Sequence, residues 1–446
     1  MRYWAWVGFL LAIAALPMPT LCATRYFDAD DPDRLPIDEV RIVGNREIGE
    51  NEILNALGHG PDDIQNAIRV LRAVLPYFKS LEWRVEEEDD LRVLVIEVVE
   101  QTTLNPEMQP SVAFNRVSGW ALGLRQEWAP RRDIRSDPRG RAFAEARYAF
   151  GADSWQHRYG AEARWLVSDR YELTATALRQ RWLASHDLEV MPNNVEQAFS
   201  AFAYAADYRD YYERFGSEWS IRARTISERH TVNVRAVAER HASMDTASRW
   251  SLFVPHGGNE ANLPATPGRL RSFAVTYLFD GRNGPVFTEG WEQSLAVERS
   301  APTLGSDFAF TRVDSHTRAY FRFGDDFINA RLRVVMTGGD PPLQRRVAWG
   351  GSGSLRGYDR HEFVGANGWL ATVEYRHSLF SGSFGLVFAD AGSVWDSDDG
   401  SVSKGTAVHA SVGYGILLEN ALRVRVARAV RSGARAKIHV RWAREF

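Results

Sequence analysis

From residue 112 to its end, the chain consists of short segments in which apolar and charged residues alternate. This alternation has the period of a β-strand with two different faces. An even number of antiparallel strands can close on itself and leave no free edge. The sequence therefore predicts a transmembrane antiparallel β-barrel of about sixteen strands over residues 112–446. The strands are expected at 112–128, 140–150, 156–166, 171–182, 197–209, 217–226, 230–241, 269–280, 289–300, 307–323, 326–337, 368–379, 382–393, 405–418, 421–430 and 434–446.

The aromatic residues favour a barrel that crosses a membrane over a soluble exported protein. The chain contains 15 Trp, 15 Tyr and 23 Phe, set among the alternating segments. In membrane barrels one face of each strand contacts lipid while the other faces a polar interior, and aromatic residues gather where membrane meets water. Past the N-terminus no apolar run approaches the ~20 residues that a membrane-spanning helix needs.

Residues 1–23 have the features of a secretory signal peptide. Arg2 precedes an apolar run from Trp4 to about Pro17, and small residues follow up to Ala23. The run is too short for a membrane-spanning helix, so we expect cleavage after Cys22 or Ala23. Cys22 is the only cysteine in the chain. We therefore expect neither a disulfide nor a cysteine-bound metal in the mature protein, and we predict no cofactor.

Charge divides the rest of the chain near Leu104. Residues 24–104 carry nineteen acidic and nine basic side chains, a net charge of −10, whereas residues 105–446 carry 38 acidic and 44 basic side chains, a net charge of +6. Residues 24–36, rich in Asp and Pro, are expected to form a tether, and residues 105–111 a linker.

Residues 37–104 are predicted to form a small α+β domain. Strands are expected at 37–43, 81–85 and 91–99, and helix-spaced apolar residues predict helices at 50–57 and 62–75. The resulting order is β-α-α-β-β. On these residues alone, a generic small α+β domain remains an alternative.

Residues 350–358 form a glycine-rich stretch with one cation, within a long break between strands from residue 338 to residue 368. Glycines let the backbone turn back where side chains would clash, and Arg356 is the single charge among them. A folded-in loop with one charge needs an acidic partner. Asp390 is our candidate, because Phe388, Asp390 and Gly392 share one face of a later strand. The motif comprises Gly350, Gly351, Gly353, Gly357 and Tyr358.

This pair of motifs resembles the BamA/TamA-like superfamily of outer-membrane assembly and translocation proteins. In that family periplasmic POTRA domains precede a bacterial surface antigen barrel, and the Arg of a folded-in loop meets the Asp of a later strand. The resemblance implies that Arg356 pairs with Asp390 in the lumen. It also implies that residues 37–104, whose first strand ends in Val43-Gly44-Asn45, form one POTRA domain. The family usually has several such domains.

The last segment has the clearest alternation in the chain. Ile438, Val440, Trp442 and Phe446 share one face and should meet lipid, whereas Lys437, His439 and Arg441 share the other and should face the lumen. An aromatic residue at the end of the final strand resembles the signal by which outer-membrane barrels are handed to the barrel assembly machinery.

The connections between strands fit one orientation, with a single exception. If the POTRA domain lies in the periplasm, the long breaks 242–268 and 338–367 fall outside the cell, as expected for such barrels. The break 183–196 would then be an unusually long periplasmic turn.

These features predict a non-enzymatic protein of the Gram-negative cell outer membrane. His361-Glu362 lacks the second His of a zinc-protease motif, and no catalytic constellation is found. The resemblance implies a role in inserting or translocating other proteins, with unfolded clients captured at the POTRA edge strand. The expected partners are outer-membrane lipid and the barrel assembly machinery, and not nucleic acid. A pore, or a barrel serving a separate partner or envelope-lipid homeostasis, is the alternative.

Overall fold

The computed structural model describes residues 39–45, 53, 78–88, 91–100, 108–128, 139–168, 170–185, 194–225, 227, 229–247, 251–253, 261–282, 289–380, 383–396, 406–418 and 422–442. The chain divides into two compact units, one formed mainly by residues up to Pro106 and the other by most of the remainder. The expected signal peptide and tether lie outside the described residues.

The N-terminal unit contains a three-stranded sheet in the order β1-β3-β2. Its strands are β1 (Glu39–Val43), β2 (Phe78–Glu88) and β3 (Leu91–Glu100). β3 pairs in parallel with β1 and antiparallel with β2. Residues 93–96 of the central strand are buried on both faces, as is Ile53, the one described residue of the two expected helices. The rest of those helices lies outside the described residues.

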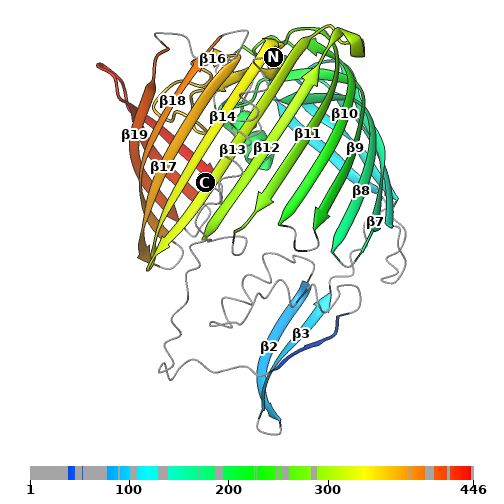
Figure 1. The fold of residues 1–446 in the computed structure, drawn as a ribbon, viewed down its shortest axis with the longest axis vertical. Helices are drawn as coiled ribbons and strands as arrows, with labels where there is room; N and C mark the ends of the chain where they lie inside the picture. The colour runs from blue at the N-terminus through cyan, green and yellow to red at the C-terminus, as the bar shows by residue number, and fades with distance from the viewer. Residues whose placement is uncertain are drawn as a thin grey trace, which may run out of the picture. The chain divides into compact units, whose positions relative to one another are not determined.

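The C-terminal unit is built on a sixteen-stranded antiparallel sheet whose strands are arranged in chain order, with β4 and β21 at its two edges. Figure 1 shows its strands side by side from β7 to β14. They are β4 (Met108–Asn115), β5 (Gly119–Trp128), β6 (Arg139–Ala149), β7 (Ser154–Leu166), β8 (Tyr171–Ser185), β9 (Tyr211–Thr225), β10 (His230–Ser243), β11 (Gly268–Asp280), β12 (Gly290–Ser300), β13 (Ala309–Phe323), β14 (Asp326–Asp340), β17 (Asn367–Phe380), β18 (Ser383–Trp395), β19 (His409–Leu418), β20 (Leu422–Ala429) and β21 (Lys437–Trp442).

The prediction of sixteen antiparallel strands is confirmed, but two local assignments behind it were wrong. The segment 112–128 is two strands, because the side chain of Asn115 accepts hydrogen bonds from the backbone N–H groups of Val117 and Ser118 and closes a tight turn. The segment 197–209 is not a strand, because residues Asn194–Tyr204 form helix α4. The sheet also begins at Met108, within the expected linker.

The corrected assignment removes the exception among the connections. Strands β8 and β9 are joined by residues 186–210, which include α4. Because successive strands are antiparallel, this connection leaves the sheet at the same end as the connections 244–267 and 341–366. The three longest connections therefore share one end, as in outer-membrane barrels.

The two faces of the sheet differ in polarity. The exposed face carries apolar side chains and the buried face carries charged ones, whereas a soluble protein has the reverse. On β17 to β19 the exposed residues include Val373, Val387 and Val412, each more than half exposed, whereas Glu374 and Asp390 are buried. Alternate residues of one strand thus place apolar side chains on the exposed face of the sheet and charged side chains on the buried face. This arrangement is typical of a strand that contacts lipid on one side. No helix within the described part of the chain is long and apolar enough to cross a membrane.

Candidate functional site

The connection between β14 and β17, residues 341–366, is hereafter called the inner loop. It contains a short 3-10 helix (Leu343–Arg345) and two short strands, β15 (Val347–Trp349) and β16 (Phe363–Gly365), which pair antiparallel. Its apolar side chains are buried in a cluster with residues of the sheet. The cluster consists of Val347, Trp349, Leu355 and Tyr358 of the loop with Val335 of β14, Leu370 of β17 and Ala429 of β20. The loop therefore packs against the strand that precedes it in the chain and against two strands that follow it.

Arg356 lies at the centre of the loop and contacts the carboxylate of Asp390. Its Nε donates to Asp390 Oδ2 at 2.9 Å, its Nη2 donates to Oδ1 at 2.6 Å, and its backbone N donates to Oδ2 at 3.2 Å. The guanidinium thus binds the carboxylate in the two-pronged arrangement that is strongest for Arg. Arg356 is 3% exposed and Asp390 is fully buried.

A second buried carboxylate completes the surroundings of this guanidinium. Arg356 Nη1 donates to Glu374 Oε2 at 3.1 Å, and Glu374 also accepts from Arg376 at 2.9 Å. The guanidinium carbon lies 3.4 Å from the centre of the Phe388 ring, so a cation–π contact adds to the ion pairs. His439 of β21 contacts the backbone oxygen of Arg356 at 2.8 Å. Arg356 therefore joins the loop to β17, β18 and β21.

Two glycines of the motif are required by close approaches of the backbone. A Cβ at Gly357 would lie 2.3 Å from the backbone N of Ala429, so only glycine lets the loop lie against β20. Gly350 has a φ of +123°, and a Cβ there would lie 2.1 Å from the carbonyl oxygen of Asp359. Gly351 also has a positive φ of +88°, and the Nη2 of Arg331 donates to the carbonyl oxygen of Gly353.

The remaining two motif residues, Tyr358 and Gly392, lie near other residues of the inner loop. Tyr358 is buried, with its ring edge-on to Phe363 and 5.0 Å away between ring centres. Gly392 faces Leu355, whose Cδ2 would lie 3.6 Å from a Cβ at that position. The structure thus gathers all the predicted motif residues around the inner loop.

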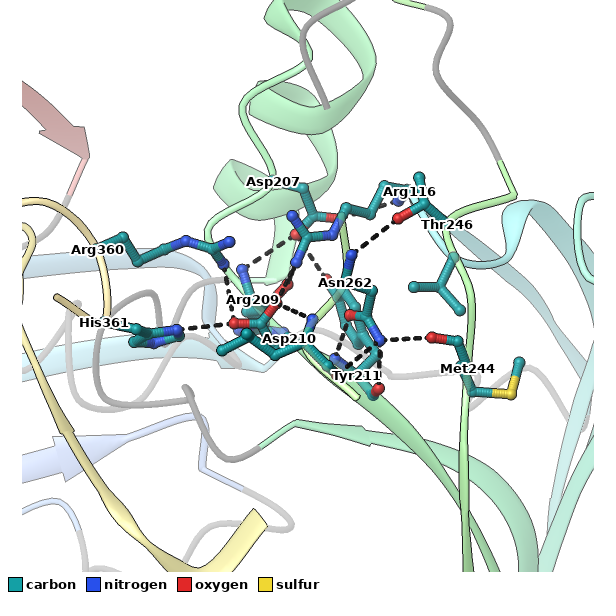
Figure 2. A network of polar contacts seen from close by, with 12 residues as sticks. Arg116, Asp207, Arg209, Asp210, Tyr211, Met244, Thr246, Asn262, Arg360 and His361 are labelled. Atoms are coloured by element: carbon teal, nitrogen blue, oxygen red, sulfur yellow. Dashed lines mark hydrogen bonds and ion pairs between the residues drawn. The ribbon is translucent and has the colours of Figure 1, made fainter. Parts of the chain in front are cut away.

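A third buried acidic residue, Asp210, holds the other half of the inner loop (Figure 2). His361 Nδ1 lies 2.8 Å and Arg360 Nη1 lies 3.3 Å from Asp210 Oδ2, while Arg116 forms an ion pair with Oδ1. The backbone N of Leu263 also donates to Oδ1 at 3.1 Å. Asp210 therefore links the inner loop to the β4–β5 turn, to the segment after α4 and to the connection 244–267.

The surroundings of Asp210 and of Asp207 shift the pKa values of these two carboxyl groups in opposite directions. Burial opposes the charge of Asp210, but the hydrogen bond from His361 and the charge of Arg360 outweigh it and hold the pKa of Asp210 well below its usual value. Burial dominates at Asp207 and raises its pKa, although the backbone N of Arg116 donates to it at 2.9 Å. The folded structure thus favours the charged form of Asp210.

Helix α4 contacts both edge strands of the sheet. Near its start, Glu196 Oε1 accepts from Arg441 Nε at 3.1 Å and from the backbone N of Trp442 at 2.9 Å, both in β21. Near its end, the ring of Phe202 lies edge-on to Phe114 of β4 and Trp120 of β5, with ring centres 5.5 Å and 5.4 Å apart. The helix therefore bridges β4 and β21, the strands between which a barrel of this order would close.

On β21 the structure separates the two expected faces. Ile438, Val440 and Trp442 are 71%, 59% and 62% exposed, whereas Arg441 is buried. Phe446, the last residue of the expected assembly signal, lies outside the described residues. Among the residues that are described, no group of three or more His, Cys, Asp and Glu side chains is placed to hold a metal ion.

Several residues of the site were not anticipated from sequence. Glu374 and Arg423 lie in segments correctly expected to be strands, and their alternation with apolar residues placed them on the inner face without indicating their partners. Asp210 and Arg116 lie in connections, where no periodic pattern exists. For α4 a signal was present, because Val195, Phe199 and Phe202 have helical spacing.

Comparison with known proteins identifies the family. The curated proteins contain no match to this chain. Among solved structures, BamA from Haemophilus ducreyi lacking POTRA domains 1–3 is 13% identical, with a TM-score of 0.48 over 91% of this chain and 83% of that one. CdiB from Acinetobacter baumannii is 10% identical, with a TM-score of 0.38 over 91% of this chain and 74% of that one. The profile of the Omp85 superfamily domain matches residues 144–427, more than half of the chain. The chain belongs to the Omp85 superfamily of outer-membrane proteins.

Proposed function

We propose that this protein assists the insertion or translocation of other proteins at the outer membrane of a Gram-negative bacterium. Family membership supports a role of this kind. The observation that carries the proposal for this chain is the burial of Arg356 against Asp390 and Glu374, which fixes the inner loop against the polar face of the sheet. We propose that the sheet closes into a barrel at β4 and β21 and that the loop occupies its lumen.

We propose that the N-terminal unit is a single POTRA domain in the periplasm that docks clients. β1 and β2 form the edges of its sheet, and a free edge can pair with an extended chain by strand addition. Deletion of residues 37–104, with the signal peptide retained, should leave a folded membrane domain that no longer supports clients. Full support of clients by this deletion variant would contradict the docking role.

Proteomic analysis of the cell envelope after depletion tests the main proposal. Loss of an assembly or translocation factor should lower the amounts of other outer-membrane or exported proteins before growth stops. Re-expression of the wild-type chain should restore them, while Arg356→Ala should restore less. An unchanged envelope proteome in depleted cells would contradict the proposal.

A pore is the second candidate, because the interior face of the sheet is polar and a large cavity lies against it. Conductance of the purified protein in planar bilayers distinguishes the two. Steady open channels together with an unchanged envelope proteome would favour the pore.

A further inference from the structure

A cavity of about 1080 Å³ lies in the C-terminal unit, lined by edge strand β4, helix α4, the inner loop and the polar face of several strands. Pockets for drug-sized molecules usually enclose about 300–1,000 Å³. The cavity is therefore large enough for a ligand of more than drug size. Neither the family assignment nor the proposed role in protein insertion explains its chemistry.

One wall of the cavity is strongly basic. Among the described residues that line the cavity, eleven are arginines and two are glutamates, and none is an aspartate or a lysine. Two of the carboxylates that pair with these arginines are each shared by two of them. Asp314 pairs with both Arg312 and Arg333, and Glu145 pairs with both Arg125 and Arg158. Positive charge is thus in excess around the cavity.

Several of these arginines have spare hydrogen-bond donors. The buried Nε atoms of Arg214 and Arg312 have no hydrogen-bond partner. Arg147 donates to Gln156 and stacks on the ring of Trp182 at 4.0 Å, with no carboxylate in ion-pair distance among the described residues. Guanidinium groups bind phosphate with paired N–H donors and remain charged under all physiological conditions. A multiply charged oxyanion matches this wall.

Another part of the lining, hereafter the apolar wall, carries no charge. It is formed by Phe114 of β4, Trp120 of β5, and Val195, Phe199 and Phe202 of α4. Val195 and Phe199 are 78% and 59% exposed, so the described part of the chain leaves this surface of the helix largely open. Trp120 lies on the same face of β5 as the exposed Leu122 and Leu124, which is the apolar outer face of the sheet. The cavity therefore joins the basic interior to the apolar exterior at edge strand β4.

We propose that this cavity binds an anionic amphiphile with a phosphate headgroup. The phosphate would lie among the arginines and the acyl chains along α4 and the outer face of β4 and β5. A free anion would use the basic wall alone and leave Phe199 in water, whereas an amphiphile satisfies both walls. This inference does not depend on the proposed role in protein insertion.

Native mass spectrometry of the folded full-length mature chain in a non-ionic detergent tests the proposal with three probes. Dioctanoyl phosphatidic acid has the charge and the chains, dioctanoyl phosphatidylcholine has the chains with a neutral headgroup, and glycerol 3-phosphate has the charge alone. We expect phosphatidic acid to bind about tenfold more tightly than either of the others, the factor that one charge-assisted hydrogen bond supplies.

Two variants in strand β13 test whether the phosphate binds at the arginines that line the cavity. Arg312 lines the cavity, and Arg312→Gln leaves Asp314 paired with Arg333 at 2.7 Å. The matched control is Arg318→Gln, outside the cavity lining, which leaves Glu292 paired with Arg282 at 3.3 Å. We expect Arg312→Gln to weaken binding of phosphatidic acid about tenfold and Arg318→Gln to leave it unchanged.

A third variant, Phe199→Ala, tests the apolar wall and remains informative if Arg312→Gln fails to fold, as judged by gel migration without boiling. It should weaken binding of phosphatidic acid and leave that of glycerol 3-phosphate unchanged. Equal binding of phosphatidic acid and phosphatidylcholine would overturn the proposal. Equal binding of phosphatidic acid and glycerol 3-phosphate would also overturn it, as would equal losses in Arg312→Gln and Arg318→Gln.

Discussion

Asp390 accepts hydrogen bonds from three nitrogens of Arg356, the backbone N and two of the guanidinium. Both side chains are buried, so each needs an opposite charge beside it, and Asp390 supplies most of the hydrogen bonds to Arg356 while Glu374 adds one. Removal of one partner from a buried ion pair leaves an unpaired charge out of water and costs about 3–5 kcal/mol. The position of the inner loop should therefore depend on this pair.

We expect Arg356→Ala to release the inner loop and expose it to protease. Asp390→Asn in the same chain should restore part of the protection, because it removes the charge that Arg356→Ala leaves unpaired. Protease digestion of intact cells, compared across the two single variants and the double variant, gives the coupling energy, expected to be about 1–3 kcal/mol. A coupling energy near zero would mean that the pair does not hold the loop.

Lys437 and Asp359 provide the control for this cycle. They form an ion pair at 2.5 Å between β21 and the same loop, but their side chains are 30% and 74% exposed. Exposed pairs contribute about 0–1 kcal/mol, so Lys437→Ala should have little effect on protection. Exchange of Arg356 and Asp390 is a poor rescue, because the aspartate at position 356 would face Glu374.

Residues of the site that belong to a recognisable local pattern could be predicted from the sequence. Residues that meet only through the folding of distant segments could not. Arg356 and Asp390 were paired because a lone cation in a glycine-rich loop precedes an acid on a defined strand face. Glu374 was missed because a buried charged face and a solvated charged face give the same alternation of residues. The partners of Asp210 come from three connections, whose meeting is determined by the three-dimensional path of the chain.

Helix α4 shows why the number of strands was right although two assignments were wrong. Ala201 and Ala203 alternate with larger residues, so the segment satisfied the period of two expected for a strand. The spacing of Val195, Phe199 and Phe202 fits a helix equally well, and contact with β4 favours the helix. Over a segment this short the two periods cannot be separated by pattern alone. The turn at Asn115 added the strand that α4 removed.

Glu196 should control the stability of the last strand. Its carboxylate accepts from the backbone N of Trp442 and from Arg441, which is 7% exposed. Glu196→Gln keeps an oxygen for the amide of Trp442, whereas Glu196→Ala removes the acceptor. Hydrogen exchange followed by mass spectrometry should show about tenfold less protection of the C-terminal peptide in Glu196→Ala than in Glu196→Gln. Equal protection in the two variants would mean that the helix does not hold β21.

Acid should loosen the inner loop at its second anchor. Because the folded structure lowers the pKa of Asp210, its charge stabilises the fold fully above the unfolded-state value of about 3.9 and progressively less as the pH falls below it. Cleavage of the loop by pepsin should therefore rise between about pH 4 and pH 2. Asp210→Asn, which has no charge to lose, should show a flatter pH dependence. The same pH profile in both chains would exclude Asp210 as the acid-sensitive group.

Helix α4 contacts both edge strands, β4 and β21. A cross-link from this helix to β21 can therefore test whether clients enter between the two strands. A short bis-maleimide bridge between Glu196→Cys and Arg441→Cys, in a chain that also carries Cys22→Ser, would fix the helix to β21. Because a client that enters by strand pairing needs this edge to be free, the bridged protein should fold but fail to restore the envelope proteome of depleted cells. The two single-cysteine variants, treated with the same reagent, control for loss of the Glu196–Arg441 ion pair. Full restoration by the bridged protein would place the client path away from this seam.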